Sequence, residues 1–279
     1  KMTIIVSNFC LVNCKHCFWK VKNTQVMEQS FLRNILDYAI NELHISRITF
    51  SGGEPTLHWE MIQNTISPFL KYKLYISVCT NAFWASTRQK AETVCKKLKE
   101  FGVKRLEIST DKYHQEYIPL DYIKNAVAAS ELEGIETVLI VCINNDEEII
   151  GYLPYKIYFK NTKIVFQHVA NIGNAQSIDN CKVPYKDLKG LKCSQIGNIS
   201  VDYLGNLYAC CGPYLQDNEQ SPLYLGKAQD HVDISKVLNE NIKFKTIALS
   251  GFDSLMNDFE KQNTYSSLCE LCQLVLNHA

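Results

Sequence analysis

The sequence lacks three features that would assign it to familiar classes of protein. It carries no net charge, because 29 basic residues balance 29 acidic ones, so nothing indicates a nucleic-acid partner or an anionic membrane. It contains no apolar run close to the length of a membrane span. Its first residues lead directly into a predicted strand rather than a signal peptide. We therefore expect a cytoplasmic protein that binds neither nucleic acid nor membrane.

Cysteine, in contrast, is abundant, at 12 of 279 residues. Such a content is compatible with the disulfides of a secreted protein. The cysteines of this chain, however, cluster at x3-x2 and x2 spacings in a sequence with 46% hydrophobic residues, a pattern that favours metal binding in a reducing cytosol. The length suits one α/β domain, alone or with an appendage.

The first cluster of cysteines is Cys10, Cys14 and Cys17, and the β-branched residues 3–7 before it predict a strand. A chain with this cysteine content would contain about 0.02 such triplets by chance. Three thiolates can hold a [4Fe–4S] cluster and leave one iron open to a small chelating molecule. A zinc site is the alternative, but structural zinc takes four ligands, and His16 is the nearest candidate for the fourth.

Apolar periodicity after this loop alternates between the helical and the extended pattern. It predicts helices over residues 29–43, 57–70, 87–101 and 121–133, and strands over residues 47–50, 74–78, 105–109, 136–141 and 163–166. This alternation predicts right-handed βαβ units around a parallel sheet. In parallel barrels the functional residues gather at the C-terminal ends of strands. Candidate ligands occupy those positions here: the cysteine loop, Gly52-Gly53-Glu54, Thr80-Asn81 and Ser109-Thr110-Asp111.

The cysteine loop, followed one strand later by a Gly-Gly-Glu turn, resembles the signature of the radical S-adenosylmethionine (SAM) superfamily. The resemblance implies an α/β fold, a partial (β/α)6 barrel over residues 1–184. It implies that a [4Fe–4S] cluster held by Cys10, Cys14 and Cys17 binds SAM through its open iron. Cleavage of SAM would yield methionine and a 5′-deoxyadenosyl radical, which abstracts hydrogen from an unactivated carbon. The implied partner is an electron donor such as flavodoxin or ferredoxin.

The resemblance also implies which residues bind SAM. In radical SAM enzymes a Gly-Gly-Glu turn after the second strand binds the amino group of SAM, a part assigned here to Gly52, Gly53 and Glu54. Paired glycines allow the backbone to approach a ligand closely. Asn81, after the third strand, and His16, within the cysteine loop, complete this part of the predicted cofactor site.

Residues 80–84 and 109–114 resemble segments of a subgroup of radical SAM enzymes that modify ribosomally made peptides. The resemblance implies that Ser109 and Asp111 hydrogen-bond the ribose or carboxylate of SAM. A helix cap is the alternative role for both residues. His114 is either an ordinary loop histidine or a catalyst, and Phe83 and Trp84 either pack or contact the substrate.

From about residue 185 the pattern changes. Extended segments at residues 199–203 and 206–209 flank Leu204-Gly205, which predicts a β-hairpin. Cys193 precedes this hairpin, a Cys-Cys pair closes it, and a Cys-x2-Cys motif follows near the end of the chain. Helices are expected over residues 234–249 and 252–263.

This second set of cysteines resembles the auxiliary-cluster modules called SPASM and twitch. The additional cysteines of a SPASM module are absent, so the resemblance implies a twitch module over residues 185–279 with one auxiliary [4Fe–4S] cluster. Its implied ligands are Cys193, Cys210, Cys269 and Cys272. A zinc ribbon is the alternative.

Apart from Cys211, which is discussed below, four cysteines belong to neither set. We expect Cys79, Cys95 and Cys142, which occupy apolar stretches, to be small buried residues. The fourth, Cys181, lies in a segment rich in Asn and Asp, where we favour an exposed thiol over a neighbour of a cluster.

Cys211 stands beside a predicted ligand, Cys210. If the strand continues through this pair, the two side chains point to opposite faces, and Cys211 would then face the active site as a hydrogen-atom donor. Two alternatives stay open. Cys211 is the ligand in place of Cys210, or it is simply buried.

The resemblance covers almost the whole chain and is nearest to radical SAM peptide epimerases of the epipeptide type, which convert L-residues of ribosomal peptides into D-residues. The chain departs from that group at Ala82, where the group has glycine, and at Ala209, where proline precedes the Cys-Cys pair. Its tail after Cys272 is also shorter. No separate domain for recognition of a leader peptide is obvious.

We therefore expect an enzyme that abstracts hydrogen from Cα of a precursor peptide and returns hydrogen from Cys211. The main alternative is a dehydrogenase or crosslinking enzyme that acts on a peptide or a small molecule and uses the auxiliary cluster as electron acceptor. Such an enzyme would need no thiol donor. A non-catalytic protein that binds zinc or an iron–sulfur cluster is the third hypothesis.

Overall fold

The computed structural model describes residues 1–19, 24–178, 183–212, 221–230 and 232–277; Cys181 lies outside them. The chain divides into two compact units. Unit one contains Lys1–Cys14 and Lys22–Gln167, and unit two contains Lys15–Val21 and His168–Ala279. The domain boundary predicted between residues 184 and 185 stays a prediction. No helix among the described residues is long and apolar enough to cross a membrane.

Unit one is built on six neighbouring strands, in the sheet order β1-β2-β3-β4-β5-β6. The pairs from β1 to β5 are parallel. The strands are β1 Met2–Ile5, β2 Arg47–Ser51, β3 Tyr75–Thr80, β4 Val103–Ser109, β5 Glu136–Ile143 and β6 Lys163–His168. Each predicted strand of this unit is present, so the predicted α/β fold with a parallel sheet is confirmed.

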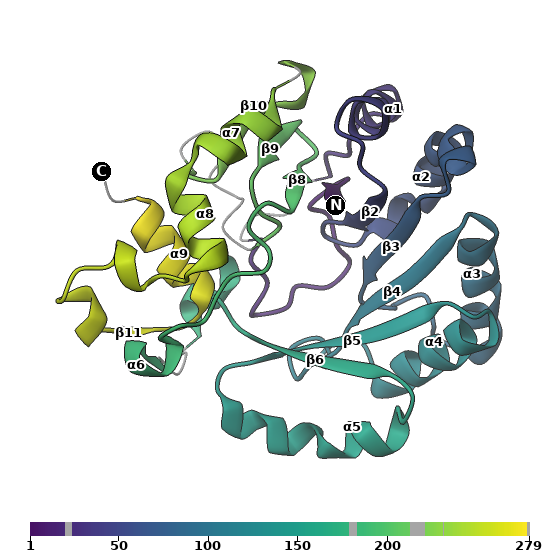
Figure 1. The fold of residues 1–279 in the computed structure, drawn as a ribbon. Helices are drawn as coiled ribbons and strands as arrows, with labels where there is room; N and C mark the ends of the chain where they lie inside the picture. The colour runs from purple at the N-terminus through teal and green to yellow at the C-terminus, as the bar shows by residue number, and fades with distance from the viewer. Residues whose placement is uncertain (20–23, 179–182, 213–220, 231, 278–279) are drawn as a thin grey trace. The chain divides into compact units, whose positions relative to one another are not determined.

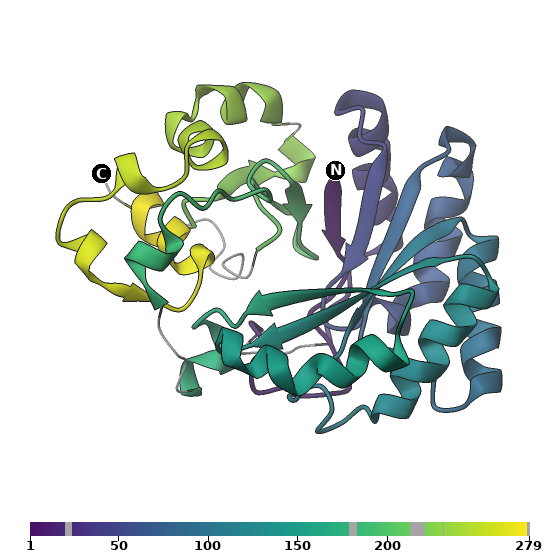
Figure 2. The same ribbon diagram turned by 60° about the horizontal axis from the view of Figure 1, so that its bottom comes forward.

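Helices connect successive strands of unit one, and Figures 1 and 2 show α2, α3 and α4 along one face of the sheet. The α-helices are α1 Gln29–Asp37, α2 Trp59–Ile66, α3 Arg88–Glu100, α4 Leu120–Leu132 and α5 Leu153–Tyr158. Tyr38–Glu42 extends α1 as a π-helical turn, and short 3₁₀ helices cover Pro55–His58, Ser67–Tyr72 and Asp146–Tyr152.

The single helix predicted over residues 57–70 is wrong in detail, because α2 is a middle segment between two 3₁₀ helices. Proline explains both ends. Pro55 lies in the first turn of the entering 3₁₀ helix, and Pro68 lies in the first turn of the leaving one. A proline lacks the N–H that would continue an α-helical ladder, so α2 ends at Ile66.

Unit two is organised around the predicted hairpin, which is confirmed. Strands β8 Ile199–Val201 and β9 Asn206–Tyr208 pair antiparallel, and β10 Tyr224–Lys227 pairs with β9. Asp202 Oδ1 accepts the N–H groups of Leu204 and Asn206 at 2.9 Å each, and Gly205 adopts φ +82°. The carboxylate and the glycine together explain why the chain reverses here.

The other elements of unit two are short. They are the 3₁₀ helix Gly173–Ser177, strand β7 Val183–Pro184 paired with β11 Thr264–Tyr265, and helices α6 Tyr185–Leu188, α7 Ile234–Glu240, α8 Ile242–Leu249 and α9 Leu268–Leu276. Further 3₁₀ helices among the described residues of this unit are Ala228–Asp230, Asp253–Leu255 and Glu260–Gln262. A core cluster that includes Phe244, Ile247, Phe252 and Leu271 joins α6, α8, β11 and α9.

Two helices predicted in this unit need correction. The helix predicted over residues 234–249 is broken at Asn241, whose backbone is extended and whose side chain caps Phe244 N–H. The helix predicted over residues 252–263 is wrong, because only two 3₁₀ turns form there. Asn257 and Glu260 each accept the other's N–H through the side chain, at 2.9 and 2.8 Å. This reciprocal cap starts a new turn.

Candidate functional site

Two glycines after β2 bring the loops after β1 and β2 together. A Cβ on Gly52, which adopts φ +142°, would lie 2.2 Å from Ser7 O, and one on Gly53 would lie 2.0 Å from Phe9 O. Gly53 N–H donates to Ser7 O at 2.9 Å, and Glu54 N–H donates to Phe9 O at 2.8 Å. Only glycine leaves room for this approach. Both glycines therefore shape the start of the cysteine loop, and their contact with SAM stays a prediction.

Glu54 is 1% exposed and joins the loops after β2 and β3. Its Oε1 accepts from Thr56 N–H at 3.2 Å, Thr56 Oγ1 at 2.6 Å and Thr80 Oγ1 at 2.9 Å. Its Oε2 accepts Asn81 N–H at 2.8 Å. Burial raises the pKa of this carboxyl group, and the four hydrogen bonds oppose that rise. Oε2 accepts one hydrogen bond where Oε1 accepts three, so Oε2 is the oxygen that has a lone pair left for a further donor.

Asn81 is 5% exposed and lies in the tight turn after β3. Its Oδ1 accepts Phe83 N–H at 2.9 Å, and its Nδ2 lies 3.5 Å from Cys10 Sγ. Ala82, between them, adopts φ +58°. Trp84 is buried and donates from Nε1 to Thr80 Oγ1 at 3.1 Å. The turn after β3 thus reaches one thiol of the predicted cluster loop.

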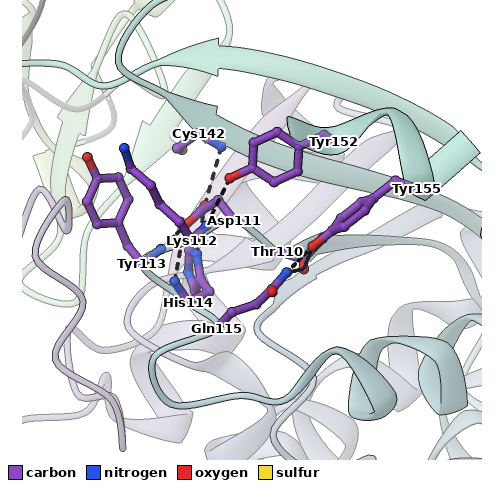
Figure 3. Close-up of polar contacts among 9 residues, drawn as sticks. All are labelled: Thr110, Asp111, Lys112, Tyr113, His114, Gln115, Cys142, Tyr152 and Tyr155. Atoms are coloured by element: carbon purple, nitrogen blue, oxygen red, sulfur yellow. Dashed lines mark hydrogen bonds and ion pairs between the residues drawn. The ribbon is translucent and has the colours of Figure 1, made fainter. Parts of the chain in front are cut away.

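Asp111 follows β4 and is 0% exposed. Its Oδ1 accepts the N–H groups of Tyr113 and His114 at 3.0 Å each. Its Oδ2 lies 2.8 Å from His114 Nδ1 and accepts Cys142 N–H at 3.3 Å (Figure 3). Asp111 therefore caps a turn and ties it to β5. This resembles the capping role considered as its alternative, and a contact of Asp111 with SAM stays a prediction.

The segment after β5 contributes polar residues that the sequence reasoning missed. Glu148 pairs with Lys112 Nζ at 2.6 Å and accepts from Asn144 Nδ2 at 3.0 Å, and Asn144 Oδ1 accepts Tyr113 Oη at 2.8 Å. Tyr152 Oη accepts Lys112 N–H at 2.9 Å (Figure 3). The signal was available, because a polar run follows this predicted strand as it follows the others.

The remaining predicted cofactor residues are less enclosed. Ser109 is half-buried at the end of β4, and no described residue hydrogen-bonds its hydroxyl. The predicted cluster loop passes from unit one into unit two after Cys14, which is buried, whereas Cys10 is half-buried. His16 and Cys17 are half-buried in the first segment of unit two.

Five thiols gather in unit two, from the segment before β8, the segment after β9 and helix α9. They are Cys193, Cys210, Cys211, Cys269 and Cys272. A Cβ on Gly212 would lie 3.2 Å from Cys210 Sγ and 3.7 Å from Cys269 Sγ, and Gly212 N–H donates to Cys210 Sγ at 3.1 Å. Glycine at this position lets the backbone pass close to both sulfurs.

The pKa shifts of these thiols are consistent with their proximity to one another. Burial raises the pKa of Cys269 and of Cys272 to about 12, and Cys193 adds to both shifts. Burial likewise raises the pKa of Cys210 well above its ordinary value, with further contributions from Cys211 and Cys269. A group of thiols this close suits an iron–sulfur cluster or zinc.

The continuous strand assumed for the Cys-Cys pair is not formed. Strand β9 ends at Tyr208, two residues before Cys210. Cys211 Sγ lies 3.5 Å from Gln195 Oε1, and its charge contributes to the raised pKa of Cys269. Strand alternation therefore does not separate Cys211 from the other thiols, because alternation holds only within a strand.

Of the three cysteines expected to be buried, Cys95 is 0% exposed, and burial raises its pKa to about 11. Cys79 on β3 and Cys142 on β5 are only partly buried, which corrects the expectation. Both alternate with fully buried neighbours along their strands. Cys79 Sγ donates to Glu107 Oε2 at 3.3 Å across the β3–β4 pair.

Together the fold and the site define an α/β protein whose candidate ligands follow the carboxyl ends of parallel strands. Residues 4–151, more than half of the chain, match the family model of the Radical SAM superfamily. The chain therefore belongs to the radical SAM superfamily of enzymes.

A relative covers the whole chain. YydG of Bacillus subtilis (strain 168), a protein named for peptide biosynthesis, is 23% identical over 298 aligned residues, which span 100% of this chain and 92% of YydG. The solved structure of anSMEcpe with bound AdoMet aligns over 88% of this chain and 82% of its own, at 17% identity and a TM-score of 0.58. SuiB of Streptococcus suis bound to S-adenosylmethionine aligns over 89% and 67%, at 14% identity and a TM-score of 0.51. These two structures show a shared fold.

Proposed function

We propose that this enzyme modifies a ribosomally made precursor peptide by inverting a Cα centre from the L to the D configuration. The similarity to YydG over the full length of the chain carries this proposal. It extends beyond the family match at residues 4–151 into the thiol-rich unit two, and the relative is named for peptide biosynthesis.

The cluster loop fits a SAM-binding [4Fe–4S] cluster by the chemistry of its donors, the thiols of Cys10, Cys14 and Cys17. When bound, the cluster and SAM supply the radical that removes a hydrogen atom from carbon. The chain binds and orients SAM. Glu54 Oε2 has the acceptor capacity that an ammonium group needs, and the Ser109 hydroxyl has no partner among the described residues.

In unit two, the close thiols support an auxiliary [4Fe–4S] cluster in a twitch-like module over residues 185–279. Its proposed ligands are Cys193, Cys210, Cys269 and Cys272. Gly212 supports this assignment, because a Cβ there would lie tightly against Cys210 Sγ, at 3.2 Å, and in contact with Cys269 Sγ, at 3.7 Å, so the backbone passes close to both sulfurs.

Cys211 is the proposed hydrogen-atom donor. Its S–H bond breaks and a new C–H bond forms on the Cα radical, which leaves a thiyl radical on sulfur. One electron, from a donor of the flavodoxin or ferredoxin class, and one proton then restore the thiol. A thiol suits this step because its hydrogen exchanges with water. Its S–H bond is also weak enough for the hydrogen atom to transfer to a carbon radical.

The experiment compares wild type and Cys211→Ala on the precursor peptide in deuterated water. Wild type should form one D-residue with one deuterium at carbon for each inverted centre. Cys211→Ala should still consume SAM and keep its full iron content, but form no D-residue. Mass spectrometry and chiral amino-acid analysis provide the readouts.

One observation favours the second candidate function, a dehydrogenase or crosslinking enzyme. Strand β9 ends at Tyr208, so strand alternation does not turn Cys211 away from Cys210, and Cys211 competes with it as a ligand. Two results together would replace epimerisation by oxidation. Cys211→Ala would lose about four irons, and wild type would form a product that is lighter by two hydrogens and carries no deuterium at carbon.

A further inference from the structure

The side-chain amide of Asn81 faces the sulfur of Cys10 in a fixed orientation. Its Nδ2 lies 3.5 Å from Cys10 Sγ, within range of an N–H···S hydrogen bond. Its Oδ1 accepts Phe83 N–H at 2.9 Å. A flipped amide would set NH₂ against that N–H and oxygen against the sulfur, so the hydrogen-bond network assigns the donor to the sulfur side.

The surroundings hold this amide in place. Asn81 N–H donates to Glu54 Oε2 at 2.8 Å, and Glu54 is itself held by Thr56 and Thr80. Asn81 is 5% exposed, so water has little access to replace its amide beside the sulfur. The residue is therefore preorganised as a donor to one thiol of the cluster loop.

We propose that Asn81 is a positioning residue that raises the reduction potential of the SAM-binding cluster through an N–H···S hydrogen bond to Cys10. The inference rests on the proposed function, in which Cys10 is a ligand of that cluster. Hydrogen bonds to the sulfurs are one of the factors that set cluster potentials. The donor compensates negative charge on the thiolate, and the reduced cluster, which carries one more electron from the external donor, gains more from it than the oxidised one.

This role differs from the direct SAM contact expected for Asn81. A contact with SAM would change SAM affinity and leave the cluster without SAM unaffected. A sulfur donor changes the potential of that cluster whether or not SAM is present. The two roles therefore separate in a measurement on the reconstituted enzyme without SAM.

The experiment uses Asn81→Asp in the full chain after anaerobic reconstitution. Asp keeps an oxygen for Phe83 N–H but replaces the donor toward Cys10 by a second oxygen. We expect the iron content to persist and the ratio of oxidised to reduced cluster at a fixed applied potential to rise at least about threefold. Redox titration followed by electron paramagnetic resonance, without SAM, measures this ratio. Asn81→Ala, which removes the donor without adding charge, should shift the ratio in the same direction by less.

Asn125→Asp is the matched control, because Asn125 Nδ2 donates to Ala85 O at 3.0 Å, away from the cysteine loop. It should leave the potential unchanged. An unchanged potential in both loaded Asn81 variants would overturn the role of Asn81, and weaker SAM binding in them would return Asn81 to the SAM site. A different result would contradict the proposed function itself: a variant with Cys10, Cys14 and Cys17 all replaced that holds as much iron as wild type.

Discussion

Ala82 holds a backbone conformation that an L-amino acid rarely adopts. Its φ is +58°, in the left-handed region, and the residue is fully buried. The steric penalty for an L-residue in this region is about 1–2 kcal/mol. Glycine avoids that penalty, but its greater conformational freedom in the unfolded chain offsets part of the gain. Ala82→Gly should therefore stabilise the protein by about 0.5–1 kcal/mol and raise the thermal midpoint by about 1–4 °C.

Calorimetry of the two proteins checks this change. Ala91→Gly is the control, because Ala91 lies inside α3 and glycine weakens a helix interior. It should lower the midpoint. A lower midpoint for Ala82→Gly as well would show that the turn after β3 tolerates alanine without strain.

At the scale of single residues, the sequence predicted positions better than contacts. The residues expected to bind SAM do follow strand ends, as the motifs indicated. The carboxylates of Glu54 and Asp111, however, accept most of their hydrogen bonds from groups of the protein itself. Part of this is local, because Thr56, Tyr113 and His114 follow within three residues of the carboxylate that they contact. The rest is not, because Thr80 and Asn81 reach Glu54 from another loop that the fold brings near.

Charged side chains link three neighbouring strands of unit one. Arg105 on β4 binds Glu136 on β5 through two hydrogen bonds, at 2.7 and 3.0 Å, and Tyr75 Oη on β3 donates to Glu136 at 2.7 Å. The Arg105 and Tyr75 hydrogen bonds hold the pKa of Glu136 below its ordinary value. Folding therefore favours the ionised carboxylate at this position.

The sign of the pH effect follows from that pKa. A carboxyl group whose pKa is lower in the folded state adds stability above its unfolded pKa, about 4.3, and loses this stability as the pH falls through the folded value. Glu136→Gln should thus cost stability at pH 7 and nothing at pH 3. The side chain is 49% exposed, so the cost should stay below about 1 kcal/mol.

Urea unfolding of wild type and variant at both pH values measures this difference. Glu60→Gln, at an exposed position of α2, is the control and should change neither value. An equal cost of Glu136→Gln at pH 7 and pH 3 would mean that packing, not charge, is lost.

At the scale of elements, periodicity predicted every strand of unit one but not the interruptions of the helices. Pro68 ends α2, and the Asn257–Glu260 cap starts a separate turn, at positions where the apolar pattern alone would continue one helix. Apolar spacing reports the buried face of an element, whereas its ends depend on single polar or cyclic residues whose partners a pattern does not reveal.

For the whole molecule, the two sets of cysteines predict two iron–sulfur clusters. The chain should hold about eight irons after anaerobic reconstitution. Replacing Cys10, Cys14 and Cys17 together with Ala should leave about four irons and abolish SAM cleavage. Replacing Cys269 and Cys272 should remove the other four and preserve SAM binding. Iron analysis checks both, and stoichiometric zinc without iron in anaerobically purified protein would contradict them.

The architecture of unit one was predictable from sequence because each βαβ step is local. Unit two was less so, because its order rests on short segments and on thiols separated by up to 79 positions, from Cys193 to Cys272. Nor did the pattern indicate that Lys15–Val21 would belong to unit two.

That early segment is fixed by residues encoded much later. Asn174 N–H donates to Cys17 O at 2.9 Å, a Cβ on Gly173 would lie 2.1 Å from Phe18 O, and Trp19, 7% exposed, lies 6.5 Å from the ring of Tyr203. At about 5–20 residues per second, the ribosome completes Tyr203 roughly 10–40 s after Trp19. Throughout that interval the Trp19 indole and the neighbouring Cys17 lack the contacts that hold them in the folded protein. The cysteine loop of the growing chain therefore completes its native contacts only late in synthesis, so the order of synthesis favours iron delivery after Tyr203 has been made.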